Sequence, residues 1–220
     1  MAFGNLGKAL AEFVGTGLLV AVVVGSGIMG SSLSQDAGVA LLINAFSTVF
    51  ALALLIFVIG PISGAHFNPA VTVVELASKK LNATLALLYV AAQILGAIAG
   101  AVLANVMFNL PAVQISSHTR INAGTFTGEI LATAGLLIVI GVLSGRGQKP
   151  IIPVAVAAWI GSAYFFTSST SFANPAVTIG RVFSNTFAGI APDSVLPFIA
   201  AQLIGALIGM LVTKGISNVR

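Results

Sequence analysis

Long apolar segments dominate this chain, and short polar or proline-containing stretches separate them. A helix needs about 20 predominantly apolar residues to cross a bilayer. Six segments have this length, over residues 9–30, 38–60, 83–108, 126–144, 151–168 and 195–213. The separators between them are Asp36, Pro111, the polar run 114–122, the turn 145–150, and Pro192 with Asp193. The pattern predicts an all-α membrane protein with six transmembrane helices.

Two further segments carry a helix-start signal inside otherwise apolar sequence. His66-Phe67-Asn68-Pro69-Ala70-Val71-Thr72 follows the second span, and Phe172-Ala173-Asn174-Pro175-Ala176-Val177-Thr178 follows the fifth. Asn is a favoured N-cap and Pro suits the first helical position. About ten helix-compatible residues follow, and they would measure about 15 Å, half of a ~30 Å hydrocarbon core. We expect two re-entrant half-helices that enter from opposite sides and meet tip to tip.

The chain also reads as an internal duplication. AAQILGA at 91–97 returns as AAQLIGA at 200–206, and Glu12 in the first span is echoed by Glu129 in the fourth. Each half holds three spans and one half-helix, so the two halves must lie in opposite orientations across the membrane. Inverted repeats of this kind place their shared site at the bilayer midplane. We expect one channel domain over 1–220, with repeats over 1–110 and 120–220.

Composition and charge support this interpretation and add an orientation. Charged residues make up 6% of the chain, against roughly 25% in a soluble domain. Positive residues concentrate in cytoplasmic loops. With the N-terminus in the cytoplasm, Arg120 and Arg181 lie outside, and the inside holds Lys8, Lys79, Lys80, Arg146, Lys149, Lys214 and Arg220. Both termini are therefore predicted to be cytoplasmic.

The few polar residues inside the spans are the candidates for chemistry. Glu12 and Glu129 are intramembrane carboxylates, and such groups are functional-site hypotheses by default. Their symmetric placement favours a role in holding the backbone amides of each re-entrant loop, with direct solute contact as the alternative. His66 is expected to support the same loop, with a pH-sensing gate as the alternative. Two His, no Cys and no clustered carboxylates leave no catalytic or metal-binding constellation.

Taken together, these motifs resemble the major intrinsic proteins, the family of aquaporins and aquaglyceroporins. The resemblance rests on AEFVGT, SGAHFNPAVT, AAQILGA, the second NPA and AAQLIGA, and it covers nearly all 220 residues. It implies a passive channel in the cell (inner) membrane, neither an enzyme nor a cofactor protein, that forms a homotetramer and contacts lipid and small neutral solutes but no nucleic acid. Its pore would be lined by the NPA residues Asn68, Pro69, Ala70, Asn174, Pro175 and Ala176.

One departure from the family concerns the selectivity filter. Most members have Arg directly after the second NPA, where this chain has Val177. Alignment by distance from the NPA motifs gives Thr48, Ser162 and Ser171 as the other filter positions. Four small uncharged residues predict a wide constriction that passes neutral solutes larger than water, such as glycerol, urea or undissociated arsenite. The pattern is similar to a bacterial aquaglyceroporin subgroup associated with arsenic resistance, whose solutes include arsenite and methylated trivalent arsenicals.

Alternatives remain open at this point. Arg181 lies one helical turn beyond Val177, where it could guard the outer vestibule or simply anchor a loop. A strict water channel is the runner-up within the class. An ion-coupled secondary transporter would need Glu12 or Glu129 at the midplane as its coupling group. A purely structural junction protein would need an occluded pore.

Overall fold

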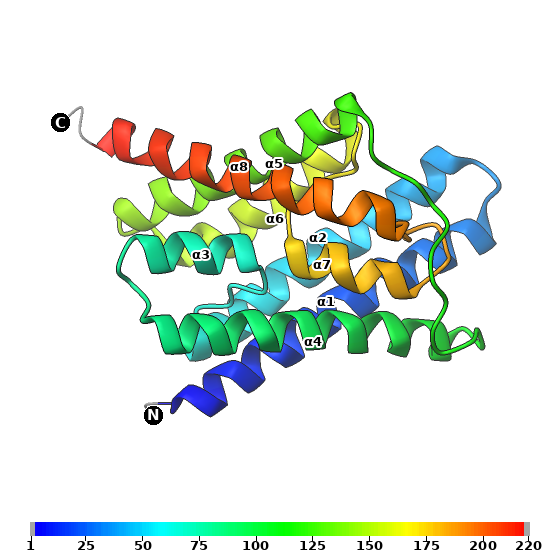
Figure 1. Ribbon diagram of the computed structural model, residues 1–220, viewed down its shortest axis with the longest axis horizontal. Coiled ribbons are helices and arrows are strands. Elements are labelled where there is room, and N and C mark those ends of the chain that lie inside the picture. The colour runs from blue at the N-terminus through cyan, green and yellow to red at the C-terminus, as the bar shows by residue number, and fades with distance from the viewer. Residues whose placement is uncertain (1–2, 218–220) are drawn as a thin grey trace.

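Helices are the only regular elements in the computed structural model, which describes residues 3–217 (Figure 1). Six helical stretches are long and apolar enough to span a membrane, as predicted; the fifth, Lys149–Phe166, joins a short 3₁₀ turn to the helix that follows it. The long helices are α1 (Asn5–Leu33), α2 (Ala37–Ser63), α4 (Ala83–Met107), α5 (Ala123–Gly145), α6 (Ile152–Phe166) and α8 (Pro192–Ser217). The short elements are α3 (Pro69–Ala77), α7 (Pro175–Gly180) and the 3₁₀ turns η1 (Lys149–Ile151) and η2 (Arg181–Phe183).

The residues that separate the spans in the sequence act as helix caps in the fold. The Asp36 carboxylate accepts from the backbone N–H groups of Gly38 (2.7 Å) and Val39 (3.0 Å) at the start of α2. Asn82 caps α4, and Asn122 with Thr125 forms a reciprocal capping box at α5. These side chains satisfy backbone donors that the first turn of a helix leaves without partners. Local sequence chemistry therefore fixes where the long helices begin.

The two short helices lie in line between the long ones (Figure 1). Helix α3 has nine residues, close to the expected length. Helix α7 has only six and continues as the three-residue turn η2, so its regular part is shorter than the ten residues expected. Together α3, α7 and η2 measure about 30 Å, one hydrocarbon thickness. The predicted pair of half-helices is confirmed.

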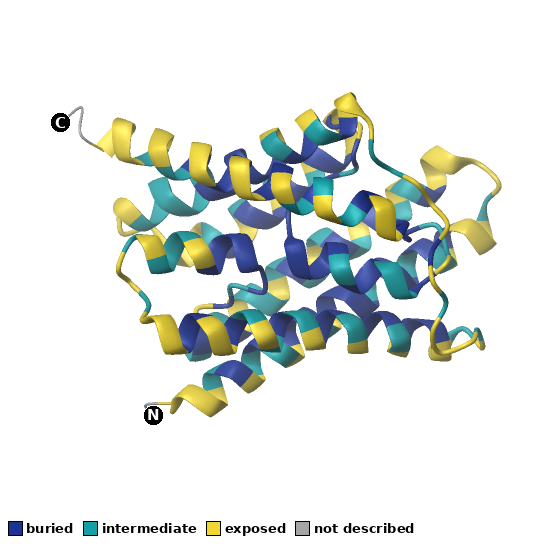
Figure 2. Cartoon of the chain, in the orientation of Figure 1, coloured by how far each residue is buried: buried dark blue, intermediate teal, exposed yellow. Residues whose placement is uncertain are grey.

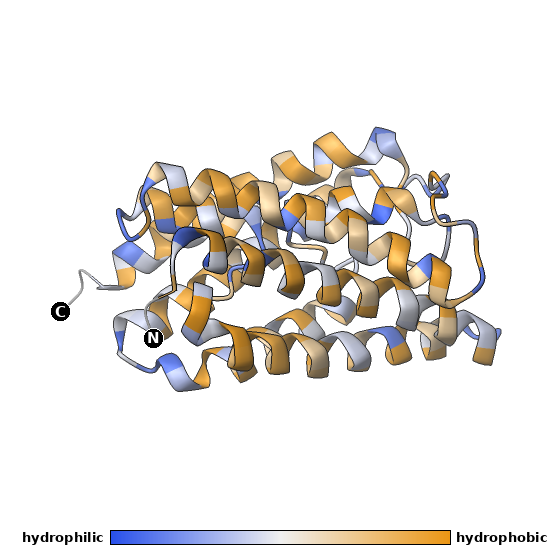
Figure 3. Ribbon diagram, turned by 90° about the horizontal axis from the view of Figure 1, so that it is seen from below, coloured by the Kyte–Doolittle hydropathy of each residue, from blue (hydrophilic) through white to orange (hydrophobic). Residues whose placement is uncertain are grey.

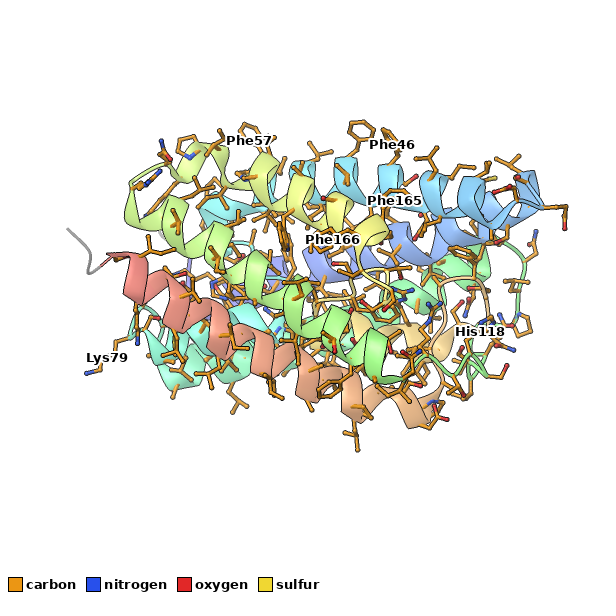
Figure 4. All side chains as sticks on the ribbon, turned by 90° about the horizontal axis from the view of Figure 1, so that it is seen from above. Phe46, Phe57, Lys79, His118, Phe165 and Phe166 are labelled. Carbon is orange, nitrogen blue, oxygen red and sulfur yellow. The ribbon has the colours of Figure 1, made fainter. Side chains whose placement is uncertain are left out.

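The bundle has two distinct ends. We call the end that holds the start of α1, the end of α8 and Lys79 the terminal end (Figures 1 and 4). The opposite end, which holds the connection 108–122 with His118 and the segment 184–191, is the loop end. Among the residues counted for orientation, Lys8, Lys79, Lys80, Arg146, Lys149 and Lys214 belong to the terminal end and Arg120 and Arg181 to the loop end. Arg220 lies outside the described residues.

Burial follows the environment that a membrane provides. The most deeply buried residues surround the meeting point of α3 and α7 (Figure 2), whereas hydrophobic residues also lie along the outer helices of the bundle (Figure 3). Phe46 and Phe57 of α2 are 55% and 69% exposed and point away from the bundle (Figure 4). An exposed apolar face of this extent is suited to contact with lipid rather than water.

Small residues bring two pairs of helices into close contact. A Cβ atom on Gly96 or Gly100 of α4 would lie 2.3 Å or 2.1 Å from a backbone oxygen of α1. A Cβ atom on Gly205 or Gly209 of α8 would lie 2.4 Å or 2.6 Å from a backbone oxygen of α5. Lipid supplies no hydrophobic force between helices, so such close backbone approach is what holds them together. The α1–α4 and α5–α8 pairs form the frame around α3 and α7.

Replacing Gly100 by Ala should therefore destabilise the protein. The added methyl group collides with the Gly17 carbonyl, and overpacking of this kind costs about 1–3 kcal/mol. Thermal unfolding in detergent, followed by circular dichroism, measures the effect. Gly215→Ala is the matched control, since no atom lies within 4 Å of that added Cβ. Equal midpoints for the two variants would contradict the packing role of Gly100.

Candidate functional site

The N-termini of α3 and α7 meet through their two asparagines. Asn68 Oδ1 accepts from the N–H of Ala70 (2.9 Å), while its Nδ2 donates to the Ala173 carbonyl (2.7 Å). Asn174 repeats the arrangement: Oδ1 accepts from the N–H of Ala176 (3.0 Å), and Nδ2 donates to the Phe67 carbonyl (2.8 Å). Each asparagine therefore caps its own helix and binds the loop that leads into the other. The expected tip-to-tip meeting is confirmed.

The loops before the two asparagines have an unusual backbone. Phe67 and Ala173, which directly precede Asn68 and Asn174, have φ values of 49° and 47°. Ala65 and Ser171, two residues earlier, also have positive φ, at 49° and 53°. Left-handed conformations cost a non-glycine residue roughly 1–2 kcal/mol each. Other contacts must therefore hold these two loops in place.

Glu12 supplies those contacts for the first loop. Its carboxylate accepts from the backbone N–H groups of His66 (2.9 Å) and Phe67 (2.6 Å). The Ser63 hydroxyl (2.6 Å) and Gln93 Nε2 (2.8 Å) also donate to it. The side chain is fully buried, and it does not belong to the cavity lining described below. These contacts match the loop-supporting role rather than direct solute contact.

Glu129 holds the second loop in the corresponding way. Its carboxylate accepts from the N–H groups of Phe172 (2.9 Å) and Ala173 (2.8 Å) and from Gln202 Nε2 (2.6 Å). The same Gln202 nitrogen lies 2.9 Å from Thr178 Oγ1 in α7, just as Gln93 contacts Thr72 in α3. The glutamines of the AAQ motifs therefore join each carboxylate to the first turns of its half-helix. The repeated AAQ motifs indicate a duplication in the sequence, but they do not by themselves indicate this contact.

Glu12 and Glu129 accept the loop N–H groups but do not line the cavity. They therefore also determine which way the loop carbonyls point. The N–H and C=O groups of a trans peptide point in opposite directions. Since the N–H groups of His66 and Phe67 point to Glu12, the carbonyls of Ala65 and His66 point away from it. Both residues line the cavity described next. These carbonyls are acceptors that a solute in the cavity can use.

One cavity of about 600 Å³ runs past the two asparagines. Ser144, Lys149 and Pro150 line it at the terminal end, and Thr48 and Tyr164 line it at the loop end. Asn68 and Asn174 lie in its wall between them. An amide nitrogen carries two hydrogens, so each asparagine keeps one for the cavity after donating the other across the loops. The cavity thus extends between both ends of the bundle.

The expected filter positions are only partly brought together. Thr48, Ser171 and Val177 all line the loop end of the cavity, but Ser162 is exposed on the outer face of α6 and the prediction for it is wrong. Tyr164 lies in the wall instead, and its hydroxyl donates to Thr48 Oγ1 (3.1 Å). At 3.6 residues per turn, Ser162 and Tyr164 face nearly opposite sides of a helix. Alignment by distance from the NPA motif took no account of this.

His66 and Arg181 also lie in the cavity wall. The His66 ring hydrogen-bonds Thr72 Oγ1 through Nδ1 (3.1 Å) and packs edge-on against Tyr89, which fits loop support. Arg181 is only 3% exposed, its Nε donates to the Ala188 carbonyl, and its guanidinium lies 3.4 Å from the Phe172 ring centroid. It is therefore both anchored to the loop 184–191 and present in the cavity wall.

A second arginine, Arg120, lies over the same ring. The Arg120 guanidinium lies 5.4 Å from the Phe172 centroid and donates to the carbonyls of Gly189 (2.6 Å) and Phe187 (2.8 Å). Burial lowers the pKa of Arg120 from its usual high value.

Within residues 3–217 no group of three His, Cys, Asp or Glu side chains could hold a metal ion. The cavity wall therefore offers hydrogen bonds and one guanidinium at the loop end.

Comparison with known proteins identifies a family for this architecture. Residues 2–171 match the model of the major intrinsic protein family. The chain is 44% identical over 208 residues to the aquaglyceroporin AqpS of Rhizobium meliloti, covering 94% of this chain and 88% of that protein. It is 29% identical to aquaporin Z of Brucella melitensis, covering 96% and 98%. The solved aquaglyceroporin of Plasmodium falciparum superposes with a TM-score of 0.76 at 20% identity, covering 98% of both chains.

Glu129→Gln should destabilise the protein strongly. The glutamine amide replaces one acceptor by a donor, so the N–H of Phe172 or Ala173 loses its partner inside the bundle. A lost buried hydrogen bond to a charged group costs about 3 kcal/mol, and thermal unfolding in detergent should show it. Glu12→Gln should behave alike. Glu75→Gln, at the partly exposed ion pair with Lys80, should cost no more than about 1 kcal/mol. Equal losses at Glu75 and Glu129 would refute the loop-holding role.

Proposed function

Because the chain belongs to the major intrinsic protein family, we propose that its cavity passes small uncharged solutes larger than water. The chain is a multi-pass membrane channel for water and small solutes rather than an enzyme. The main support for the passage of solutes larger than water is Val177, which lies in the cavity wall directly after the second NPA motif. A short apolar side chain there leaves room and offers no fixed charge to a passing solute.

The loop end of the cavity suits hydroxylated solutes. Thr48, Tyr164 and Ser171 bring three hydroxyl groups to its wall, and Val177 adds an apolar side chain. The Ser171 hydroxyl is buried and has no protein partner within the described residues. Glycerol, urea and undissociated arsenite all carry several hydrogen-bonding groups that can exchange partners along such a wall. Tyr164 makes the constriction narrower than the four small residues expected from the sequence alone, which favours small, flat or flexible solutes.

Ions are disfavoured at the meeting point of the two half-helices. The N-terminus of each helix carries about half a positive charge, and the free amide N–H groups of Asn68 and Asn174 add hydrogen-bond donors there. A cation loses its hydration and meets these positive ends, whereas a neutral molecule turns its oxygen toward them. This arrangement supports passive transport of uncharged molecules rather than ion conduction.

We further propose where the channel lies and how it assembles. The terminal end, with its six positive side chains described above, would face the cytoplasm of a cell with an inner membrane. The relative with 44% identity is a bacterial aquaglyceroporin, which supports this location. Homotetramer assembly follows the family expectation, with one pore per subunit. The subgroup associated with arsenic resistance suggests undissociated arsenite and methylarsenite as solutes.

Swelling and shrinkage of proteoliposomes distinguish the competing functions. A channel for larger neutral solutes should pass glycerol, urea and arsenite along with water, without saturation and without dependence on an ion gradient. Water flux with no passage of any of the three would identify a strict water channel. Saturable uptake that needs a proton or sodium gradient would identify a secondary transporter, although Glu12 and Glu129 are engaged with the loops.

Val177→Arg should restore the charge and narrow the constriction. We expect glycerol and arsenite flux to fall about tenfold or more, while water flux falls by less than about twofold, since a pore selects by its diameter and lining groups. Stopped-flow light scattering on matched proteoliposomes measures all three. Val177→Met is the control for bulk without charge. An equal loss of water and glycerol flux in a well-expressed Val177→Arg protein would show that this position does not select solutes.

A second pair of variants tests the corrected constriction. Thr48→Phe places an aromatic ring in the cavity wall next to Tyr164 and should cut glycerol flux about tenfold. Ser162→Phe places the same ring on the exposed face of α6 and should leave the glycerol flux and the water flux unchanged. Both variants are compared with the parent channel at equal protein content. A large loss of flux in Ser162→Phe would mean that α6 presents a different face to the cavity.

A further inference from the structure

Arg181 is a buried cation at the loop end of the cavity, and it has no carboxylate partner. Among residues 3–217 the only ion pair within 4.0 Å joins Lys80 to Glu75 at the terminal end. The Arg181 side chain is nevertheless 3% exposed. Buried charges in proteins are almost always paired or coordinated. An unpaired guanidinium in the wall of a cavity therefore calls for a partner that comes from outside the chain.

The protein fixes this guanidinium without using its terminal nitrogens. The Nε group donates to the Ala188 carbonyl, and one face of the guanidinium covers the Phe172 ring. Phe172 is held in turn by an edge-on contact with Phe198, with ring centroids 5.2 Å apart. The two terminal nitrogens carry four of the five N–H donors of an arginine. They have no protein acceptor among the described residues, and the side chain lines the cavity, so these donors are directed into it.

Further donors and the charge distribution add to the same site. Ser171, next to Phe172 in the chain, lines the cavity with a buried hydroxyl that has no protein partner. The other charged residues of the cavity wall, Glu75 and Lys149, belong to the terminal end. The loop end of the cavity therefore has a positive charge that no acidic residue of its wall balances. The rigid fork of an arginine matches two oxygens bound to one atom.

We propose that the loop end of the cavity is a binding site for small oxyanions, in which Arg181 donates a pair of hydrogen bonds to two oxygens of the ligand and Ser171 donates a third. The chemical class is a small monoanion such as a carboxylate, phosphonate or arsonate. The inference rests on the proposed function in one respect, that the same cavity is the solute pathway. A bound oxyanion would then occupy the mouth beside Val177 and compete with neutral solutes for entry.

Titration of the detergent-purified full chain with methylphosphonate tests the binding site at constant ionic strength. Isothermal titration calorimetry should show one ligand per chain. Arg181→Lys keeps the charge but loses the fork, and it should weaken binding about tenfold. Arg181→Met should abolish it, and Ser171→Ala should weaken it about threefold. Lys149→Met is the matched control, because it removes a cation from the other end of the same cavity and should leave binding within about twofold.

Three results would overturn the site: no binding to the parent protein, equal affinity in Arg181→Lys, or loss of binding in Lys149→Met. Arg181→Lys keeps the test decisive if Arg181→Met does not fold. Glycerol flux into proteoliposomes gives an independent arm, in which external methylphosphonate should inhibit the parent channel but not Arg181→Lys at the same concentration. Glycerol flux without methylphosphonate binding defeats this inference alone, and binding without any glycerol flux defeats the proposed function alone.

Discussion

The structure depends on the double use of two asparagine side chains. Each carbonyl oxygen caps its own half-helix, and each amide nitrogen crosses to the backbone of the opposite loop at 2.7–2.8 Å. Irregular backbone inside a bilayer persists only where it is buried in protein or lines a wet cavity. The asparagines meet this condition for both loops at once. Each one binds the backbone of the opposite loop and so keeps that loop inside the protein, away from lipid. At the two asparagines the chain turns back instead of crossing the bilayer, and the cavity lies beside this turn.

Two buried carboxylates make that meeting possible. The loops carry non-glycine residues in left-handed conformations, among them Phe67 and Ala173, and such strain costs roughly 1–3 kcal/mol per residue. Glu12 and Glu129 each accept two successive loop N–H groups, and hydrogen bonds to a charged group contribute about 1.5–3 kcal/mol each. The bonds offset strain of the same order, and they leave the loop carbonyls on the side of the cavity. Stability and solute contact thus come from the same few peptide groups.

The two halves of the chain are alike at the centre and different at the ends. Around the asparagines the contacts of Glu12, Gln93 and Thr72 correspond to those of Glu129, Gln202 and Thr178. At the terminal end, α3 finishes in the partly exposed pair of Glu75 and Lys80. At the loop end, α7 gives way to η2 and the buried Arg181. The duplication accounts for the symmetric contacts where the two loops meet. The two ends of the cavity differ because, within the part of the chain that the structure describes, only the loop end has a buried arginine and only the terminal end has the Glu75–Lys80 ion pair.

The sequence by itself determined the six spans and the two half-helices, and it predicted a loop-holding role for the buried carboxylates, because caps, apolar length and charge act through neighbouring residues or through the membrane. It could not determine which side of α6 meets the cavity. That helix is apolar all round, since lipid lies on one side and packed protein on the other, so Ser162 and Tyr164 could not be told apart by hydropathy. The setting of Arg181 likewise depended on Phe172 and Ala188, which belong to separate loops. Only the tertiary structure decided these two features, because both depend on contacts between segments that no local pattern links.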